Sequence, residues 1–163
     1  MMTDAPFHQV AYVVTDLDES VRHWADVLGV GPWSVWTMGP DVVTEALYHG
    51  APARFGFRHA LAWSGSVQIE LVEPFEGPSI FDDQLTARGP GLNHIGRLAD
   101  DHAAASAALV ERGFTPLQSA SFGASGDGRF AYFGSPNGDS IVELIHPPTR
   151  RFTPDYIYPV QEG

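Results

Sequence analysis

An internal repeat is the feature of this sequence that most restricts its fold. The segment QIELVEP at 68–74 matches IVELIHP at 141–147 with an offset of 73 residues. The segment FHQV at 7–10 matches NHIG at 93–96 with an offset of 86 residues. Each copy therefore opens with a histidine and closes with a glutamate, and we expect the two copies to fold as one repeated unit.

Local patterns predict the same order of elements in both copies. Short apolar and β-branched runs bounded by Gly, Pro and Ser are typical of strands. They lie near 7–14, 33–38, 42–48, 55–63, 67–73, 92–99, 115–122, 129–134 and 139–146. Asp16, with Glu19 three residues later, indicates a helix that begins there and ends at Gly29. Asp100 or Asp101 begins a second helix, which stops at Gly113.

This order predicts an α+β fold made of two tandem βαβββ modules within a single domain. We expect the modules to form one curved, cup-like mixed sheet with the helices outside. Module one spans 5–75, a Pro- and Gly-rich connector spans 76–91, and module two spans 92–147. The remaining tail, 148–163, is too rich in proline for a helix and is predicted to be extended.

The repeated His–Glu pairs predict a metal site. Side chains alternate along a strand, so a pseudo-twofold axis between the modules would let both pairs point into one cavity. The chain has no cysteine, so His, Asp and Glu are the remaining ligands. We therefore predict that His8, Glu70, His94 and Glu143 hold one divalent ion, which is Zn, Co, Ni, Mn or Fe. Taken singly, each is more often a core or surface residue, and the recurrence favours the ligand interpretation.

Hairpin registers suggest two residues beside the ligands. If Ser64-Gly65 is a two-residue turn, His59 lies opposite Glu70. The same register around Asn137-Gly138 places Tyr132 opposite Glu143. Both would then face the cavity and contact a carboxylate or the substrate, whereas a shifted register would point them outward.

Two further residues are candidates for substrate binding. Trp36 belongs to an aromatic-rich stretch that could line an apolar pocket. Arg129 could meet an anionic substrate. The alternative interpretations are a core position for Trp36 and a surface position for Arg129.

Charge and hydropathy exclude several partners. A net charge of -11 is unsuited to nucleic acid, whose phosphates call for a basic surface. No apolar run approaches the ~20 residues that cross a bilayer, and the N-terminus does not have the pattern of a secretory signal. We expect a cytoplasmic protein that binds a small molecule. The exposed curved sheet and the apolar tail favour a homodimer.

The motifs resemble those of the vicinal oxygen chelate superfamily, which includes glyoxalase I, methylmalonyl-CoA epimerase, extradiol dioxygenases and bleomycin-resistance proteins. The resemblance covers about residues 7–147. It rests on HQVAYVV at 8–14, DLD at 16–18, LGVGPW at 28–33, IEL at 69–71, GLNHI at 91–95 and VEL at 142–144. It places the family's four ligand positions on His8, Glu70, His94 and Glu143. Asn93 departs from the epimerase-like branch, which often has a second histidine there.

The resemblance implies a metal-dependent isomerase, epimerase or lyase that transfers a proton next to a carbonyl of a small organic substrate. It gives Glu143 the roles of ligand and base, and Glu45 that of a second base, unless Glu45 is simply an exposed strand carboxylate. One alternative is an Fe(II) extradiol-type dioxygenase, although Glu70 as a fourth ligand argues against its two-His, one-carboxylate site. The other is a binding protein that sequesters a small molecule or antibiotic. A coenzyme A ester usually requires basic residues for its phosphates, and this chain has only nine, so methylmalonyl-CoA is one open alternative as substrate.

Overall fold

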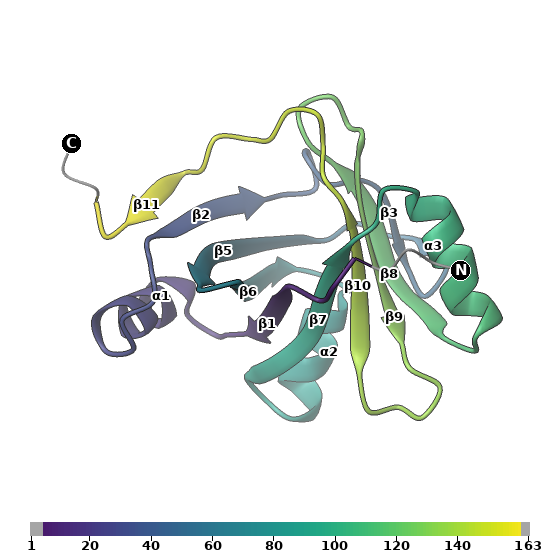
Figure 1. The fold of residues 1–163 in the computed structure, drawn as a ribbon, viewed down its shortest axis with the longest axis horizontal. Coiled ribbons are helices and arrows are strands. Elements are labelled where there is room, and N and C mark those ends of the chain that lie inside the picture. Colours follow the sequence, from purple (N-terminus) through teal and green to yellow (C-terminus); the bar gives the residue numbers. More distant parts are fainter. Residues whose placement is uncertain (1–4, 161–163) are drawn as a thin grey trace.

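The computed structural model describes residues 5–160, whose strands form one mixed sheet of eleven strands with helices outside it (Figure 1). The first module contains β1 (Gln9–Val13), α1 (Leu17–Asp26), β2 (Trp33–Met38), β3 (Thr44–Tyr48), β4 (Ala51–Pro52), β5 (Gly56–Ser64) and β6 (Val67–Glu76). The rest of the chain contains α2 (Ile80–Ala87), β7 (Gly91–Leu98), α3 (His102–Glu111), β8 (Thr115–Phe122), β9 (Gly128–Gly134), β10 (Ile141–His146) and β11 (Tyr156–Tyr158). The α+β fold predicted from the repeat is confirmed.

The sheet is symmetric about the junction of β1 and β7. The strand order is β11-β2-β5-β6-β1-β7-β10-β9-β8-β3-β4. β1 runs parallel to β6, β7 runs parallel to β10, and the antiparallel β1–β7 pair joins the modules. The repeated His–Glu strands are therefore the central strands of the sheet.

Each module covers its outer face with a helix whose start follows from capping. Asp16 Oδ1 accepts a hydrogen bond from the Glu19 amide at 2.9 Å, and Asp101 caps α3 in the same way through the Ala104 amide. α1 buries Leu17 and Val21 against strands of module one. α3 buries Leu109 against module two. A third apolar cluster, which includes Phe57, Phe81, Phe130 and Tyr132, lies between the modules.

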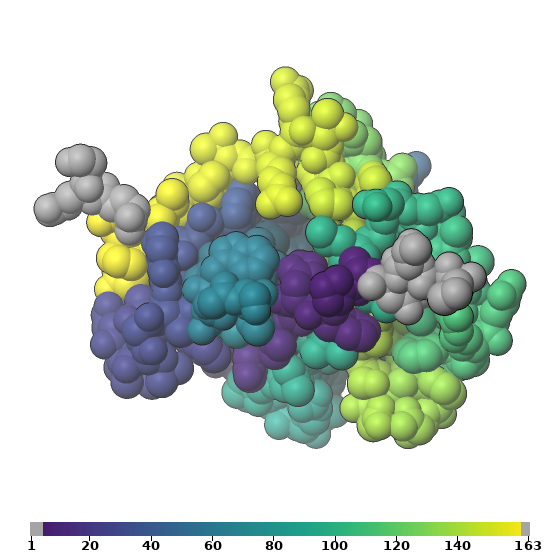
Figure 2. Space-filling model, in the orientation of Figure 1, coloured from purple at the N-terminus to yellow at the C-terminus, as the bar shows by residue number. Residues whose placement is uncertain are grey.

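Three features of the fold were not predicted from the sequence. The connector contains a helix, α2, capped by Ser79 and buried through Ile80 and Phe81. β3 and β4 belong to module one in sequence, but β3 pairs with β8 of module two. In return, β11 of the tail pairs with β2 of module one, and Figure 2 shows the tail along the rim of the hollow between the modules. Within the described residues, no helix is long and apolar enough to span a membrane.

Candidate metal centre and cavity

A cavity of about 280 Å³ lies between the two modules, and its two ends differ in chemistry. The polar end presents carboxylate, imidazole, amide and phenol groups of Gln9, His59, Gln68, Glu70, Tyr132 and Glu143. The apolar end is lined by Trp36, Met38, Phe57, Phe122, Phe130 and Phe152. Such a combination of an apolar wall and a few convergent polar groups is typical of a small-molecule site.

Glu70, His94 and Glu143 converge at the polar end. Their ligand atoms all lie within 4.8 Å of one another. His94 Nε2 is 3.2 Å from Glu70 Oε2 and 3.1 Å from Glu143 Oε2. All three residues are buried, with at most 5% of their surface exposed. The strand pairing produces this convergence, since Glu70 and His94 both lie opposite Ala11 of β1.

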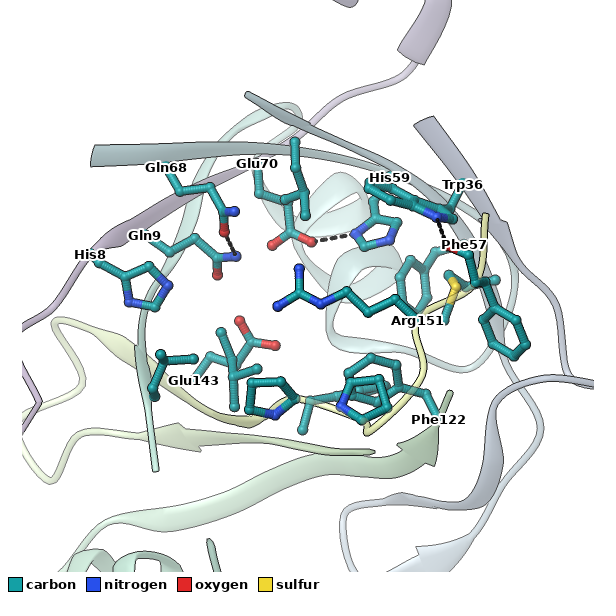
Figure 3. A pocket seen from close by; sticks show the side chains of 18 of the residues that line it. His8, Gln9, Trp36, Phe57, His59, Gln68, Glu70, Phe122, Glu143 and Arg151 are labelled. Atoms are coloured by element: carbon teal, nitrogen blue, oxygen red, sulfur yellow. Dashed lines mark hydrogen bonds and ion pairs between the residues drawn. The ribbon is translucent and has the colours of Figure 1, made fainter. Parts of the chain in front are cut away.

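Gln9 supplies a fourth polar atom. It lies on the same face of β1 as Ala11, opposite both Gln68 and Gly96. Gln9 Nε2 donates a hydrogen bond to Gln68 Oε1 at 3.0 Å, which fixes the orientation of the amide. Gln9 Oε1 is left buried without a hydrogen-bond partner, and Figure 3 shows Gln9 beside Glu70 and Glu143.

His8, predicted from the sequence as the fourth ligand, does not join this group. It immediately precedes β1, and alternation along the strand places Gln9 rather than His8 on the face of Glu70 and His94. His8 lies at the cavity edge (Figure 3), and its ring stacks on Trp63 with ring centroids 6.1 Å apart. Partial burial there lowers the pKa of His8. The structure therefore brings together three of the four predicted ligands and adds Gln9.

Neighbouring side chains orient two of the candidate ligands, His94 of β7 and Glu70 of β6. His94 Nδ1 lies 2.8 Å from Asn93 Oδ1, an arrangement that turns Nε2 toward the carboxylates. Asn93 is held in turn by its amide, which donates to Gln84 Oε1 at 3.0 Å. His59 Nδ1 lies 2.8 Å from Glu70 Oε1, which leaves Oε2 as the oxygen of this carboxylate without a hydrogen bond.

The two predicted hairpin registers had different outcomes. Glu143 lies opposite Tyr132, as expected. The register for Glu70 was wrong: Glu70 pairs with Leu61 and His59 pairs with Val72, because the turn is Gly65-Ser66. A shift of two residues keeps each side chain on its original face, so His59 still reaches Glu70 diagonally.

The electrostatics of the group separate its two carboxylates. Burial raises the pKa of Glu143, and the charge of Glu70 adds to this effect. Burial also acts to raise the pKa of Glu70, but the hydrogen bond with His59 and the charges of His59 and His94 outweigh burial and lower it. For His94, burial acts to lower the pKa, but Glu143 and Glu70 together raise it to about 9.

The group fits a divalent cation. Gln9 Oε1, Glu70 Oε2, His94 Nε2 and Glu143 Oε2 are all buried without a hydrogen-bond partner. Even a protonated His94 offsets only one of the two buried carboxylates, and the negative charge that remains is costly to bury without a cation. The space among them exists because Gly96 has no side chain: a Cβ there would lie 2.6 Å from Gln9 Oε1 and 3.2 Å from Glu143 Oε2. One imidazole and three oxygens suit a borderline-to-hard first-row metal.

Glu45 and Arg129, two other predicted site residues, lie outside the cavity. β3 is irregular between Thr44 and Leu47, and the exposed Glu45 side chain accepts a hydrogen bond from Ser121. Arg129 lies opposite Ser121 and close to Glu45, with Nη2 3.7 Å from Glu45 Oε2. Neither side chain lines the cavity, because this face of β8 and β9 is the one opposite Phe122 and Phe130.

Trp36 and Tyr132 do line the cavity, as predicted. The Trp36 indole N–H donates to the carbonyl of Phe152 in the tail at 2.9 Å, which leaves its ring against His59. Tyr132 is buried beside His94, with ring centroids 4.9 Å apart. Burial and the charges of Glu143 and Glu70 hold the pKa of Tyr132 well above its ordinary value, so its phenol stays protonated.

Several solved structures share this fold. Methylmalonyl-CoA epimerase from Mycobacterium tuberculosis is 20% identical, with a TM-score of 0.62 over 91% of this chain and 93% of that chain. A methylmalonyl-CoA epimerase in complex with methylmalonyl-CoA and NH4+ is 18% identical, with a TM-score of 0.57 over 93% of this chain and 100% of that chain. A mutant of 4-hydroxymandelate synthase from Streptomyces coelicolor is 21% identical, with a TM-score of 0.63 over 97% of this chain and 43% of that chain.

Sequence comparison gives the family directly. No functionally curated protein matches the chain at a significant level. The model of the Glyoxalase/Bleomycin resistance protein/Dioxygenase superfamily matches residues 8–133, which include β1, β6 and β7 of the candidate centre. The chain therefore belongs to the glyoxalase/bleomycin resistance protein/dioxygenase superfamily.

Proposed function

We propose that this protein is a divalent-metal-dependent isomerase, epimerase or lyase that transfers a proton next to a carbonyl of a small organic substrate. In this proposal Gln9, Glu70, His94 and Glu143 hold the ion. The observation that carries it is the convergence of four buried polar atoms, one from each residue, that lack hydrogen-bond partners. Such atoms are rare in folded proteins and call for an unseen ligand.

The chemistry follows from the different environments of the two carboxylates. A bound divalent ion supplies Lewis acidity, which polarises a substrate carbonyl and makes the adjacent C–H more acidic. Glu143 is the better base, because burial and the charge of Glu70 raise its pKa. We propose that the Glu143 carboxylate, as ligand and base in turn, takes the proton and returns it to the substrate.

Two further residues would assist this transfer. His59 holds Glu70 Oε1 and keeps that carboxylate ionised, so Glu70 serves mainly as a ligand. The protonated Tyr132 borders the cavity near Glu143 and can donate a hydrogen bond to a substrate oxygen. Glu45, exposed on the far face of the sheet, has no place in the proposed transfer.

The donor set also separates this proposal from oxygen activation. Non-haem Fe(II) oxygenases use two histidines and one carboxylate with open positions. The group in this chain has one histidine and two carboxylates, and it adds an amide oxygen. The fold is shared with proteins described as epimerases, one of them solved with methylmalonyl-CoA, which supports proton transfer next to a carbonyl as the reaction class.

The test combines metal content with proton exchange. We expect the purified protein, incubated with Zn, Co, Ni or Mn and then desalted, to retain about one ion per chain by mass spectrometry. In D2O, the loaded protein should exchange a proton next to the carbonyl of at least one compound among 2-oxo acids, hemithioacetals and acyl thioesters, followed by NMR. Glu143→Gln should abolish exchange, whereas the surface variant Glu111→Gln should not change it.

Two results would contradict the proposal. A purified protein that retains none of these metals would contradict the proposed metal-dependent function. Retained Fe(II) together with substrate-dependent oxygen consumption would assign the protein to the dioxygenases instead.

A further inference from the structure

The C-terminal tail brings one arginine to the cavity. Arg151 lines it together with Pro147, Pro148 and Phe152. Figure 3 shows its side chain reaching from the tail across the cavity, toward the end that holds Glu70. Among the lining residues, Arg151 is the one with a permanent positive charge.

Hydrogen bonds and close packing hold the segment before Arg151 against the loop between β8 and β9. The Ala124 amide donates to the carbonyl of Arg150 at 3.2 Å. The Thr149 amide donates to the carboxylate of Asp127, at 3.3 Å and 3.2 Å from its two oxygens. Gly123 packs so closely on Pro148 that a Cβ at Gly123 would lie 2.3 Å from the ring.

The segment after Arg151 is fastened to β2. Trp36 Nε1 donates to the carbonyl of Phe152, and the Asp155 amide donates to the carbonyl of Val35 at 2.7 Å. β11 then pairs with β2 in an antiparallel register. The backbone on both sides of Arg151 is thus held, which fixes the point from which its side chain enters the cavity.

The guanidinium itself has no partner in the described part of the chain. No hydrogen bond or ion pair joins Arg151 to residues 5–160, although the same cavity contains the carboxylates of Glu70 and Glu143. A guanidinium presents N–H donors in a planar fork that matches a carboxylate. Its free donors are therefore available to a molecule inside the cavity.

Charge balance indicates the sign of that molecule. A divalent ion would neutralise the negative charges of Glu70 and Glu143, and Gln9 and a neutral His94 add no charge. Arg151 would then leave the loaded cavity with a positive charge facing an apolar wall. Although Arg151 is exposed to solvent, this charge attracts an anion that enters the cavity more strongly than a neutral molecule.

The aromatic end of the cavity indicates the chemistry of the uncharged part of the bound molecule. Phe57, Phe122 and Phe130, with Trp36 and Phe152, give the cavity an aromatic end. Aromatic and aliphatic groups bury well against such a wall. A cavity of about 280 Å³ suits a small molecule better than a long polar chain.

We propose that Arg151 is a specificity-determining residue that binds the carboxylate of a small organic acid whose apolar body packs against the aromatic end of the cavity. This inference rests on the proposed metal-dependent function and names the substrate class for that site. It assigns the tail a role in substrate recognition in addition to its pairing with β2.

The experiment compares an acid with its neutral analogue. Benzoylformate and benzoylformamide have the same aromatic body and the same 2-oxo group, and only the first is charged. Their affinities for the Ni²⁺-loaded protein are measured by calorimetry. We expect the wild type to bind benzoylformate at least about tenfold more tightly, the lower range for a charge-assisted hydrogen bond at a partly open site.

Variants then locate the preference. Arg151→Gln should lose the tenfold preference while its affinity for benzoylformamide stays unchanged, and Arg151→Lys should keep part of it. Arg150→Gln is the matched control, since Arg150 is adjacent and exposed but does not line the cavity. The visible spectrum of the Co²⁺-loaded variants should be unchanged, which shows that the metal end is intact.

The outcomes separate the two proposals. A wild type that takes up no metal contradicts the proposed function. A metal-loaded wild type that binds neither probe, or shows no preference for the acid, contradicts the substrate class. An Arg151→Gln variant that keeps the preference for benzoylformate contradicts the role of Arg151. This result would not contradict the proposed metal site.

Discussion

Metal binding is expected to raise the melting temperature of the wild-type protein by several degrees. A ligand present at 100 times its dissociation constant stabilises the native state by about 2.7 kcal/mol. For a chain of 163 residues, about 1 kcal/mol shifts the melting temperature by roughly 2–4 °C. The expected rise is therefore about 5–11 °C between chelator-treated and metal-supplemented protein, measured by differential scanning calorimetry.

Replacing Glu143 with Gln should remove this rise. The substitution keeps the size of the side chain but removes one of two carboxylates whose ligand atoms lie within 4.8 Å of each other and of His94. Without metal, the variant should be at least as stable as the wild type, because one buried negative charge is gone and Glu70 still lies 3.2 Å from His94. Glu111→Gln, on the exposed side of α3, is the control and should keep the full rise. An equal rise in Glu143→Gln would refute the assignment of this carboxylate as a ligand.

Three further predictions concern the same centre. Gly96→Ala should keep the fold but weaken metal binding at least tenfold in a competition titration, since its Cβ would meet Gln9 Oε1 at 2.6 Å; unchanged affinity would exclude Gln9 as a ligand. His59→Ala should weaken metal binding about 10–100-fold by freeing Glu70, the range typical for loss of a residue that orients a ligand; unchanged affinity would show that His59 does not act on the metal. Because the pKa of His94 is raised to about 9 without metal, its proton must leave when the ion binds, so affinity should rise about tenfold per pH unit up to about pH 9. Calorimetry at pH 7 in buffers of different ionisation enthalpy should therefore detect release of about one proton, and no release would contradict this protonation state.

The repeat predicted most of the fold because it reports interactions that are local or repeated. The caps at Asp16 and Asp101 and the strands that carry Glu70 and Glu143 follow from local patterns. The exchange of β3 and β11 between the modules does not. Which edge a short strand joins depends on contacts between distant segments, and no local pattern in 44–48 or 156–158 specifies its partner.

The errors in the predicted site come from strand phase. Aligning His8 with His94 placed the first module one residue out of phase, whereas an offset of 85 residues would have matched Gln9 with His94. In the structure Ala11, two residues after Gln9, pairs with both Glu70 and His94, so the side chains of Gln9, Glu70 and His94 share one face of the sheet. A phase difference of one residue changes the side chain that faces Glu70 and His94 from His8 to Gln9, whereas the two-residue register error leaves His59 on its predicted face.

Arg151 was missed for a different reason. Its position depends on anchors at Trp36 and Ala124, which are far away in sequence. A proline-rich tail predicts only extended backbone and not what it passes over. The sequence offers Arg129 as the candidate for binding an anionic substrate, but its side chain lies on the opposite face of the sheet from Phe130.

The most direct test of the account is an anomalous diffraction map of crystals of the Co²⁺- or Ni²⁺-loaded protein, recorded at the metal edge. If these four residues hold the ion, the map should show one strong peak between the modules, roughly 2.0–2.3 Å from His94 Nε2 and from oxygens of Gln9, Glu70 and Glu143. A peak coordinated by His8 in place of Gln9, or an ion bound elsewhere with this group unoccupied, would contradict it.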